Sequence, residues 1–459
     1  MRVPSTGWQV NWRCRCARLD RKGVAELTAR RDALVERCLA RGARLYEGNF
    51  AKLYTGKLSP GCLTCARGEW SYLEVSQLCQ KRCFYCPRPQ TRLGRPFERM
   101  LGLPFDFPGA YARAVRELGF RGVGLSGGEP LLAMDRTVRL LRSLRRSGGK
   151  GLYLWAYTNG ALADGARLKR LRDAGLDELR FDLSACDYDL SAVRRAVRLI
   201  PAVAVEIPAI PEDLERVKAL LGELAAGGVR YLNLHQLTGT PFNDENFRRR
   251  GYTVVDNGPM ISPSVVESEL AALSLIDYSL EKGIGLPINY CSFVYKRRFH
   301  ARIRRSRLAG RLMTGGRLET VTEPGWVRGI MVKGDRAPLA ALARRLPSGK
   351  SRLVDVEGES RLLVAPETLE SPALRGREIA AAYSEYEQEL PGRGAPGSPS
   401  LGLGRGKLVR YRRTRQAEIL LRGRRELALF ARALGPVRLR RFAGLEFMDA
   451  SRHSYRGAD

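Results

Sequence analysis

Histidine is scarce in this chain of 459 residues, with three in all, which argues against an enzyme whose metal is held by several histidines. Signatures of other common chemistries are missing too, since the sequence has no P-loop, no G-x-S-x-G and no H-E-x-x-H. No run of about 18 apolar residues occurs, which excludes a membrane-spanning helix. The first residues have neither an apolar core nor a small-residue cleavage site, so we expect no secretory signal and a cytoplasmic protein.

Lysine is also scarce, whereas arginine is abundant. Of 79 basic residues 12 are lysine and the other 67 arginine, against 48 acidic residues, and the net charge is +31. Selection for charge alone gives no reason to favour arginine so heavily, so we favour a biased composition with a solvated basic surface. The alternative is that the basic segments bind RNA, DNA or another polyanion.

The rest of the composition is that of a folded protein with reduced thiols. Hydrophobic residues make up 44% of the chain, enough for a sizeable core. Ten cysteines in a reducing compartment indicate metal binding or redox chemistry rather than a disulfide framework. We divide the chain into a basic helical segment (1–60), a barrel (61–310), a small α+β module (311–390), a Pro/Gly/Ser linker (391–405) and an Arg-rich, partly ordered tail (406–459).

A series of strand–helix units dominates the middle of the chain. The strand candidates are short, apolar and rich in β-formers, at 72–76, 122–125, 152–157, 178–183, 202–207 and 231–236. Helical patterns lie between most of them, and several end at glycines, as at Gly175 and Gly227. Successive βα units make a parallel sheet. We therefore expect a (βα)6 partial barrel, with an open doubly wound sheet as the alternative.

The most informative stretch is SQLCQKRCFYCPRP, directly after the first strand candidate. It places Cys79, Cys83 and Cys86 in the spacing C-x3-C-x2-C. A short loop of this kind can wrap three thiolates around a 4Fe–4S cluster, which leaves one iron without a protein ligand. An open coordination position is typical of a catalytic metal centre. Tyr85 could cover the cluster or an adjacent ring.

A second interpretation of the same cysteines is a zinc ribbon. Cys62 and Cys65 form one C-x2-C pair, and Cys83 and Cys86 form another 17 residues further on. This spacing matches a four-cysteine zinc site in a nucleic-acid-binding protein. The ribbon leaves Cys79 unexplained and places the first strand of the barrel inside the zinc site.

The motif LSGGEP follows the second strand candidate. Loop residues at the carboxyl end of a parallel strand face the ligand. Gly127 and Gly128 let backbone groups approach a ligand closely, and the carboxylate of Glu129 can hold an ammonium group.

With these two motifs together, the stretch from about Glu74 to Gln236 resembles the radical S-adenosylmethionine (radical SAM) superfamily. The resemblance implies a partial (βα)6 TIM-like barrel of the radical SAM type, with the three cysteines around a 4Fe–4S cluster whose open iron chelates SAM. It also implies reductive cleavage of SAM and abstraction of a hydrogen atom from a substrate. An electron donor such as a ferredoxin or flavodoxin is implied as partner, and the enzyme would be oxygen-sensitive.

A longer similarity, over about 45–307, is to uncharacterised radical SAM proteins related to pyruvate formate-lyase activating enzyme. It rests on GCLTCARG, FYCP and INYCSFVYK and supplies no substrate.

The resemblance implies further SAM-binding residues. Gly128 and Glu129 would contact the SAM amino group. The positions that would hold ribose, carboxylate or adenine are Asn159, Asp182, Ser184 and Glu206, and those facing the pocket at the end of the sixth strand are Asn233, His235 and Gln236.

The remaining cysteines give two further hypotheses. In the first, Cys62 and Cys65 belong to a second metal site, either zinc or an auxiliary cluster, with Cys14 and Cys16 as candidate partners; isolated reduced thiols are the alternative. Cys291 and Cys186 follow predicted strands and are candidate hydrogen-atom donors, with His235 as a third catalytic candidate. Inert buried thiols are the alternative for both cysteines.

Overall fold

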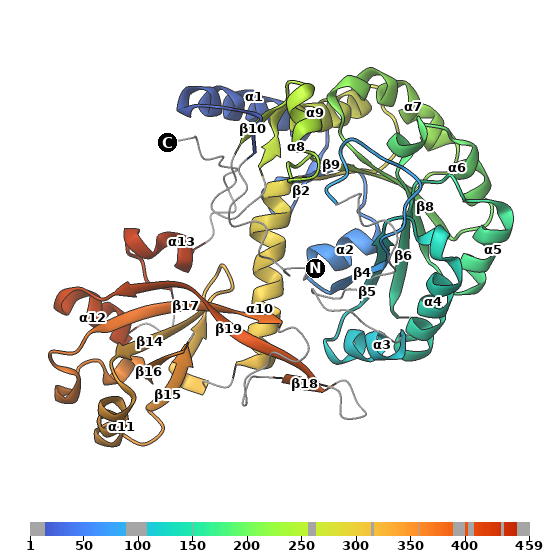
Figure 1. Ribbon diagram of the computed structural model, residues 1–459. Coiled ribbons are helices and arrows are strands. Elements are labelled where there is room, and N and C mark those ends of the chain that lie inside the picture. Colours follow the sequence, from blue (N-terminus) through green and yellow to red (C-terminus); the bar gives the residue numbers. More distant parts are fainter. Residues whose placement is uncertain are drawn as a thin grey trace. The chain divides into compact units, whose positions relative to one another are not determined.

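The computed structural model describes residues 14–88, 108–149, 151–255, 263–313, 316–356, 358–388, 400–402, 408–432 and 436–447 (Figure 1). The described residues up to 297 form one compact unit, and those from 298 to 447 form a second. No helix in these described ranges is both long and apolar enough to cross a membrane.

The first unit is built on a nine-stranded sheet. Its order is β2-β3-β12-β9-β8-β7-β6-β5-β4. The strands are β2 (Arg44–Tyr46), β3 (Asn49–Tyr54), β4 (Trp70–Ser76), β5 (Gly122–Gly127), β6 (Tyr153–Thr158), β7 (Glu178–Phe181), β8 (Ala202–Pro208), β9 (Tyr231–His235) and β12 (Ile288–Cys291). Neighbours from β4 to β9, and β9 with β12, pair in parallel, whereas β3 runs antiparallel to both β12 and β2.

Helices connect the parallel strands and lie along the outer face of the curved sheet (Figure 1). They are α3 (Pro108–Glu117), α4 (Met134–Gly148), α5 (Gly165–Asp173), α6 (Ser191–Ala196) and α7 (Leu214–Ala226). A doubly wound sheet would carry such helices on both faces. The prediction of a partial barrel is therefore confirmed, and its six strands lie close to the predicted positions.

A short helix, α2 (Pro60–Ala66), lies inside the curve of the sheet near the amino ends of its strands (Figure 1). Ser59 caps it by accepting a hydrogen bond from the backbone amide of Cys62 at 3.1 Å. A Cβ placed on Gly61 or Gly122 would meet the buried Trp155 ring at 3.3 and 2.9 Å, so these glycines let α2 and β5 approach that ring. The Trp155 ring and α2 fill the barrel at the amino ends of its strands. The carboxyl ends of the strands carry the cysteine loop and the glycine pair.

Segments predicted to lie outside the barrel are part of this unit. Within 1–60, β2 and β3 extend the sheet, and α1 (Arg21–Ala40) packs on α9 (Val266–Glu281) through the buried ion pair of Arg31 with Glu269, 3.0 Å long. A small sheet of β1 (Ala17–Arg18), β10 (Thr253–Val255) and β11 (Ser264–Val265) and the short α8 (Asp244–Arg249) complete the unit.

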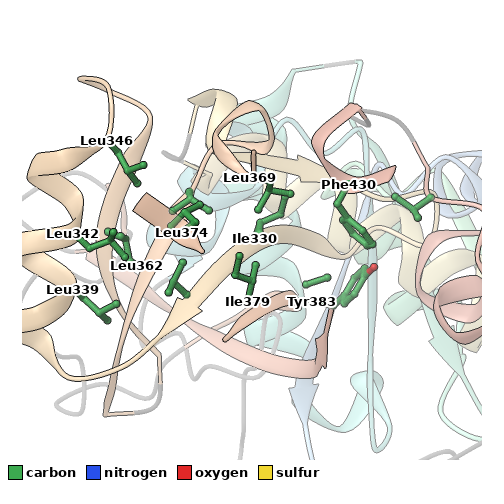
Figure 2. Packing of buried hydrophobic residues seen from close by; sticks show 14 of the residues in the cluster. Ile330, Leu339, Leu342, Leu346, Leu362, Leu369, Leu374, Ile379, Tyr383 and Phe430 are labelled. Atoms are coloured by element: carbon green, nitrogen blue, oxygen red, sulfur yellow. The ribbon is translucent and has the colours of Figure 1, made fainter. Parts of the chain in front are cut away.

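The second unit contains a seven-stranded antiparallel sheet. Its strands are β13 (Glu319–Val321), β14 (Val327–Lys333), β15 (Ser351–Val356), β16 (Glu359–Val364), β17 (Ile379–Gln388), β18 (Ser400–Gly402) and β19 (Leu408–Leu420), and its helices are α10 (Ala301–Leu312), α11 (Arg336–Arg345), α12 (Gly423–Arg432) and α13 (Ala443–Glu446). Aliphatic side chains of the sheet and α11 form its core with Tyr383 and Phe430 (Figure 2).

The division of the chain therefore differs from the predicted one. Residues 298–310 belong to the second unit, and β19, α12 and α13 lie within the segment predicted to be a separate Arg-rich tail. β19 pairs with β17 along its length, apart from one shift in register at Tyr383/Ser384, so its arginines belong to a sheet rather than to a loose tail. Most of the predicted linker, 391–399 and 403–405, lies outside the described residues.

Candidate active site

Three cysteines stand on the loop that follows β4. Cys79, Cys83 and Cys86 are all partly exposed, and a turn is closed by the backbone amide of Cys86 donating to the carbonyl of Cys83 at 3.0 Å. Burial, followed by smaller contributions from Asp182 and the thiols of Cys86 and Cys79, raises the pKa of Cys83 to about 11. A metal bound here would therefore have to displace thiol protons.

The three thiols are near one another without meeting at one point. Among the residues that the structure describes, the one group of three or more candidate ligands within 4.8 Å is Cys14, Cys16 and Asp244. The loop cysteines are thus not arranged around a single ion. In a 4Fe–4S cluster each thiolate binds a different iron, which fits the wider spacing.

The zinc-ribbon alternative is not formed in the described part of the chain. Cys62 and Cys65 lie on α2, and the Sγ of Cys62 is 3.4 Å from Oδ1 of Asn233 in the interior of the barrel. They do not converge with Cys83 and Cys86. The spacing of the two C-x2-C pairs resembles that of a zinc ribbon, but an entire strand of the barrel, β4, lies between the pairs and keeps them apart.

The two glycines after β5 press against the start of the cysteine loop. The backbone amide of Gly128 donates to the carbonyl of Ser76 at 2.7 Å. A Cβ on Gly127, whose φ is +128°, would lie 2.1 Å from that carbonyl oxygen, and one on Gly128 would lie 2.0 Å from the carbonyl oxygen of Leu78. Only glycine permits this contact, which fixes the backbone just before Cys79.

Glu129 is buried and fully engaged with its own chain. Its Oε1 accepts from the amide of Leu131 at 3.0 Å and from the hydroxyl of Thr158 at 2.9 Å, and its Oε2 accepts from the amide of Asn159 at 2.8 Å. Burial raises its pKa, although these three hydrogen bonds oppose the shift. In the described structure Glu129 ties the end of β5 to the end of β6.

The predicted SAM-binding residues of β6 and β7 gather beside the cysteine loop. Tyr85 donates a hydrogen bond to Oδ2 of Asp182 at 2.9 Å, and its hydroxyl is 2.7 Å from Oγ of Ser184. Asn159 Oδ1 accepts from Nε2 of Gln80 at 3.1 Å. Burial raises the pKa of Asp182, and the Ser184 and Tyr85 hydroxyls oppose this. The loop is therefore bonded to both strand ends.

Glu206 faces a different set of partners. It accepts from Nη1 of Arg180 at 2.7 Å, and its Oε1 lies 2.7 Å from Nε2 of His235. Nδ1 of His235 lies 3.1 Å from the Nζ of Lys296. Burial raises the pKa of Glu206, but His235 and Arg180 outweigh this and the pKa is lowered. The pKa of His235 is lowered by burial and by Lys296, so a neutral imidazole accepts from Lys296 and donates to Glu206.

The other candidates at the strand ends have distinct neighbours. Cys291 pairs in register with His235 across β12 and β9, so the two side chains share a face of the sheet. Cys186 donates to the carbonyl of Asn159 near the cysteine loop. Gln236 bridges the backbones of Val265 and Phe293, which is a structural role.

Sequence reasoning missed the charged residues inside the barrel. Arg180 is buried and binds Glu178 at 2.6 Å as well as Glu206. Lys52 donates to Oδ1 of Asn289 at 2.9 Å. Alternation along β7, with Glu178 and Arg180 on one face and apolar residues on the other, was a signal that could have identified Arg180.

The predicted second metal site is divided between two places. Cys14 and Cys16 meet Asp244, whereas Cys62 and Cys65 lie on α2. The pKa of the Cys65 thiol is raised by burial and by nearby Cys291 and Cys62, so its sulfur neighbours are these cysteines. No four-thiolate group forms among the described residues.

The middle of the chain matches the model of a known family. Residues 73–250 match the model of the Radical SAM superfamily, so this part of the chain is a radical SAM domain. The superfamily binds a 4Fe–4S cluster and SAM, and the chain is an enzyme with these cofactors and an unknown substrate.

Two relatives illustrate the range of the family. A Methanocaldococcus jannaschii protein, provisionally assigned as a glycyl-radical enzyme activating enzyme, is 27% identical over 355 residues, covering 73% of this chain and 89% of the relative. A Metallosphaera sedula protein, provisionally assigned as a GTP 3′,8-cyclase, is 34% identical over 111 residues, covering 24% of this chain and 32% of the relative.

Solved structures with matching regions include two enzymes with SAM bound. Streptococcus suis SuiB has 11% identity and a TM-score of 0.34, covering 49% of this chain and 51% of SuiB. The anSMEcpe structure, which also holds a Cp18Cys peptide, has 18% identity and a TM-score of 0.28, covering 36% of this chain and 50% of that protein.

Proposed function

We propose that Cys79, Cys83 and Cys86 hold the 4Fe–4S cluster and that the enzyme cleaves SAM reductively to abstract a hydrogen atom from its substrate. The observation that carries the proposal is the cysteine loop, whose three thiols lie near one another without converging on a single ion. Bound together, the cluster and SAM supply a 5′-deoxyadenosyl radical. Residues around the cysteine loop and at the ends of β9 and β12 would bind, orient and shield these groups.

On the SAM side, the hydrogen-bonded group of Tyr85, Asp182 and Ser184 would orient the nucleoside, with Asn159 beside Cys79. Gly127, Gly128 and Glu129 would act mainly by holding the loop, because their described polar contacts are to the protein backbone and to Thr158. The predicted contact of Gly128 and Glu129 with the SAM amino group would then be made through the loop backbone.

On the substrate side, His235 ends β9 and Cys291 ends β12, and Lys296 lies in the helical turn that follows β12. The side chain of His235 is one third exposed, so it can reach a bound molecule. The Lys296 side chain lies next to it, which favours a substrate with an anionic or carbonyl group. Cys291 would return a hydrogen atom to a substrate radical, with Cys186 as the second candidate; the thiyl radical left behind would take a second electron from the external electron donor and a proton to restore the thiol.

The relative from Methanocaldococcus favours a protein as the substrate, since a glycyl-radical activating enzyme acts on a glycine of another chain. Reductive cleavage of SAM needs one electron, which a ferredoxin or flavodoxin would deliver. Binding of RNA or another polyanion by the basic segments, a cytoplasmic location and oxygen sensitivity stay predictions.

The test is anaerobic reconstitution with iron and sulfide, followed by dithionite and SAM. We expect cluster absorbance and formation of 5′-deoxyadenosine in the wild type, and neither in the Cys79→Ala/Cys83→Ala/Cys86→Ala variant. The matched control is Cys38→Ala, because Cys38 is a buried thiol of α1 that contacts the carbonyl of Leu273. A wild type that takes up only zinc and leaves SAM intact would contradict the proposal.

A further inference from the structure

Two cysteines and an aspartate from distant parts of the sequence meet in the first unit. Cys14 and Cys16 lie next to β1, and Asp244 is the first residue of α8. All three are buried, at 7%, 6% and 2% exposure. One ligand atom from each lies within 4.8 Å of the others, and no other described residues form such a group.

Hydrogen bonds already organise these atoms. The thiol of Cys14 donates to Oδ1 of Asp244 at 3.0 Å, and the backbone amide of Arg15 donates to the same oxygen at 3.0 Å. The Arg15 guanidinium reaches Oδ2 at 3.1 Å. The thiol of Cys16 lies 3.8 Å from Oδ1. Both sulfurs therefore face the same carboxylate oxygen.

This geometry suits a single ion rather than a cluster. Two sulfur ligands of a tetrahedral zinc, each about 2.3 Å from the metal, stand about 3.8 Å apart. The sulfurs of Cys14 and Cys16 lie 3.0 and 3.8 Å from Oδ1 of Asp244, and all three atoms are within 4.8 Å of one another, unlike the thiols of the loop after β4. Sulfur with oxygen is a ligand set that zinc accepts.

The charges also largely offset one another. Two thiolates and one carboxylate carry three negative charges, and zinc carries two positive charges. The guanidinium of Arg15, which is 64% exposed and also pairs with Glu245, lies against the carboxylate and offsets part of the remaining charge. Compensation of this kind lowers the cost of burying charged ligands. Zinc would displace the two thiol protons, and Asp244 would keep Arg15 as its second partner.

We infer that Cys14, Cys16 and Asp244 form a zinc site, with a fourth position for water, distinct from the cluster loop. The position of this site next to α8 gives the ion a structural role. The neighbouring Asn243 donates to the carbonyl of Tyr85 at 3.0 Å, and Asn246 donates to the carbonyl of Phe84 at 3.1 Å. Zinc would fix α8 to residues 14–16, and α8 holds the backbone between Cys83 and Cys86.

The site does not depend on the proposed function, so it can be tested separately. The first experiment uses the full chain carrying Cys79→Ala/Cys83→Ala/Cys86→Ala, grown with zinc, and measures metal per chain by plasma mass spectrometry. We expect about one zinc ion, lost on adding Cys14→Ser/Cys16→Ser and retained on adding Cys38→Ala. Asp244→Asn should weaken zinc binding without abolishing it, because both sulfurs remain. Zinc content that does not respond to Cys14 and Cys16, or is absent from the start, would overturn the inference.

A second measurement needs no substitution and so does not depend on the variants folding. The wild-type chain is alkylated with iodoacetamide with and without a chelator, and the labelled cysteines are mapped by mass spectrometry. Cys14 and Cys16 should react only after the chelator removes zinc, whereas labelling of Cys38 should not change. Equal labelling of Cys14 and Cys16 in both conditions would contradict a bound ion. Cluster absorbance and SAM cleavage, measured in parallel, report on the proposed function alone.

Discussion

The backbone amide of Asn159 donates a hydrogen bond to the Glu129 carboxylate across 2.8 Å, and this bond joins the ends of two neighbouring parallel strands. Glu129 itself follows the glycine pair that presses on the cysteine loop, while Asn159 Nδ2 lies 3.8 Å from the Sγ of Cys79. The position of the first cysteine therefore depends on a carboxylate that needs no ligand to be satisfied.

Replacing Glu129 with Gln should loosen this arrangement. Three hydrogen-bond donors converge on the carboxylate, and a Gln amide group cannot accept from all of them because its nitrogen is a donor. Leaving a buried donor unsatisfied costs about 1–3 kcal/mol of the free energy of unfolding. We expect that loss in urea unfolding, together with lower iron content after reconstitution. Glu215→Gln, at an exposed carboxylate of α7, is the control and should change neither. Full stability with normal iron content in Glu129→Gln would contradict this.

Substitutions of Gly127 and Gly128 test whether the glycine pair positions the cysteine loop. Gly127→Ala and Gly128→Ala place a Cβ 2.1 and 2.0 Å from a backbone oxygen, far closer than van der Waals contact allows, so the loop before Cys79 must move. We expect reconstituted iron to fall several-fold in both variants. Gly222→Ala is the matched control because a Cβ there meets nothing within 4 Å and α7 should gain up to about 1 kcal/mol. If all three variants load iron equally, the glycines do not position the cluster loop.

Much of the first unit could be predicted from the sequence because its signals are local. The strands are short apolar runs, and the cysteine and glycine motifs stand directly at their ends, so the approach of the loops to one another follows from the parallel order. Which polar side chains lie inside the barrel was harder to predict. Arg180 reads as a surface residue by type, and only the spatial neighbours Glu178 and Glu206 make its burial favourable.

Contacts between distant segments could not be predicted. Nothing local links Cys14 to Asp244, which are 230 residues apart, so the first cysteine pair was assigned to the wrong partners. The strand β19 was not predicted from the sequence, for a different reason. Its arginines obscure the alternation of apolar and polar residues that identifies a strand, and pairing with β17 supplies the missing stabilisation.

The imidazole of His235 should make stability depend on pH. Its pKa is lowered in the folded protein, first by burial and then by Lys296, while in the unfolded chain it is about 6.5. Between these two values the unfolded state binds the extra proton, so the free energy of unfolding falls as the pH drops below about 6.5. Each unit of difference between the pKa of the folded and unfolded states changes the free energy of unfolding by about 1.4 kcal/mol. Urea unfolding from pH 7.5 to 5.5 should show a shallower pH dependence in His235→Gln.

A second variant tests whether Lys296 contributes to the lowered pKa of His235. Lys296→Met removes the neighbouring positive charge, so the pKa of His235 should rise towards its ordinary value and the slope should again decrease. Slopes in either variant that equal or exceed that of the wild type would show that another group governs the pH dependence.

The buried ion pair between Arg31 and Glu269 should show that α1 is an integral part of the first unit. The two side chains are 1% and 0% exposed and join at 3.0 Å, and Arg31 also donates to the carbonyl of Phe50 in β3 at 2.5 Å. Arg31→Met leaves Glu269 buried without its counter-charge, which typically costs about 3–5 kcal/mol of unfolding free energy. Arg30→Met, on the exposed face of the same helix, is the control and should change stability by no more than about 0.5 kcal/mol.

The double variant Arg31→Met/Glu269→Leu completes the thermodynamic cycle. Removing both charges restores an apolar contact between α1 and α9, so its free energy of unfolding should return most of the way to the wild-type value. The single and double variants are compared by urea unfolding at one pH. An Arg31→Met protein as stable as Arg30→Met would mean that α1 adds nothing to the fold and behaves as the separate basic segment predicted from the sequence. Recovery in the double variant would instead show that the barrel needs α1 packed against α9, with the charges themselves dispensable.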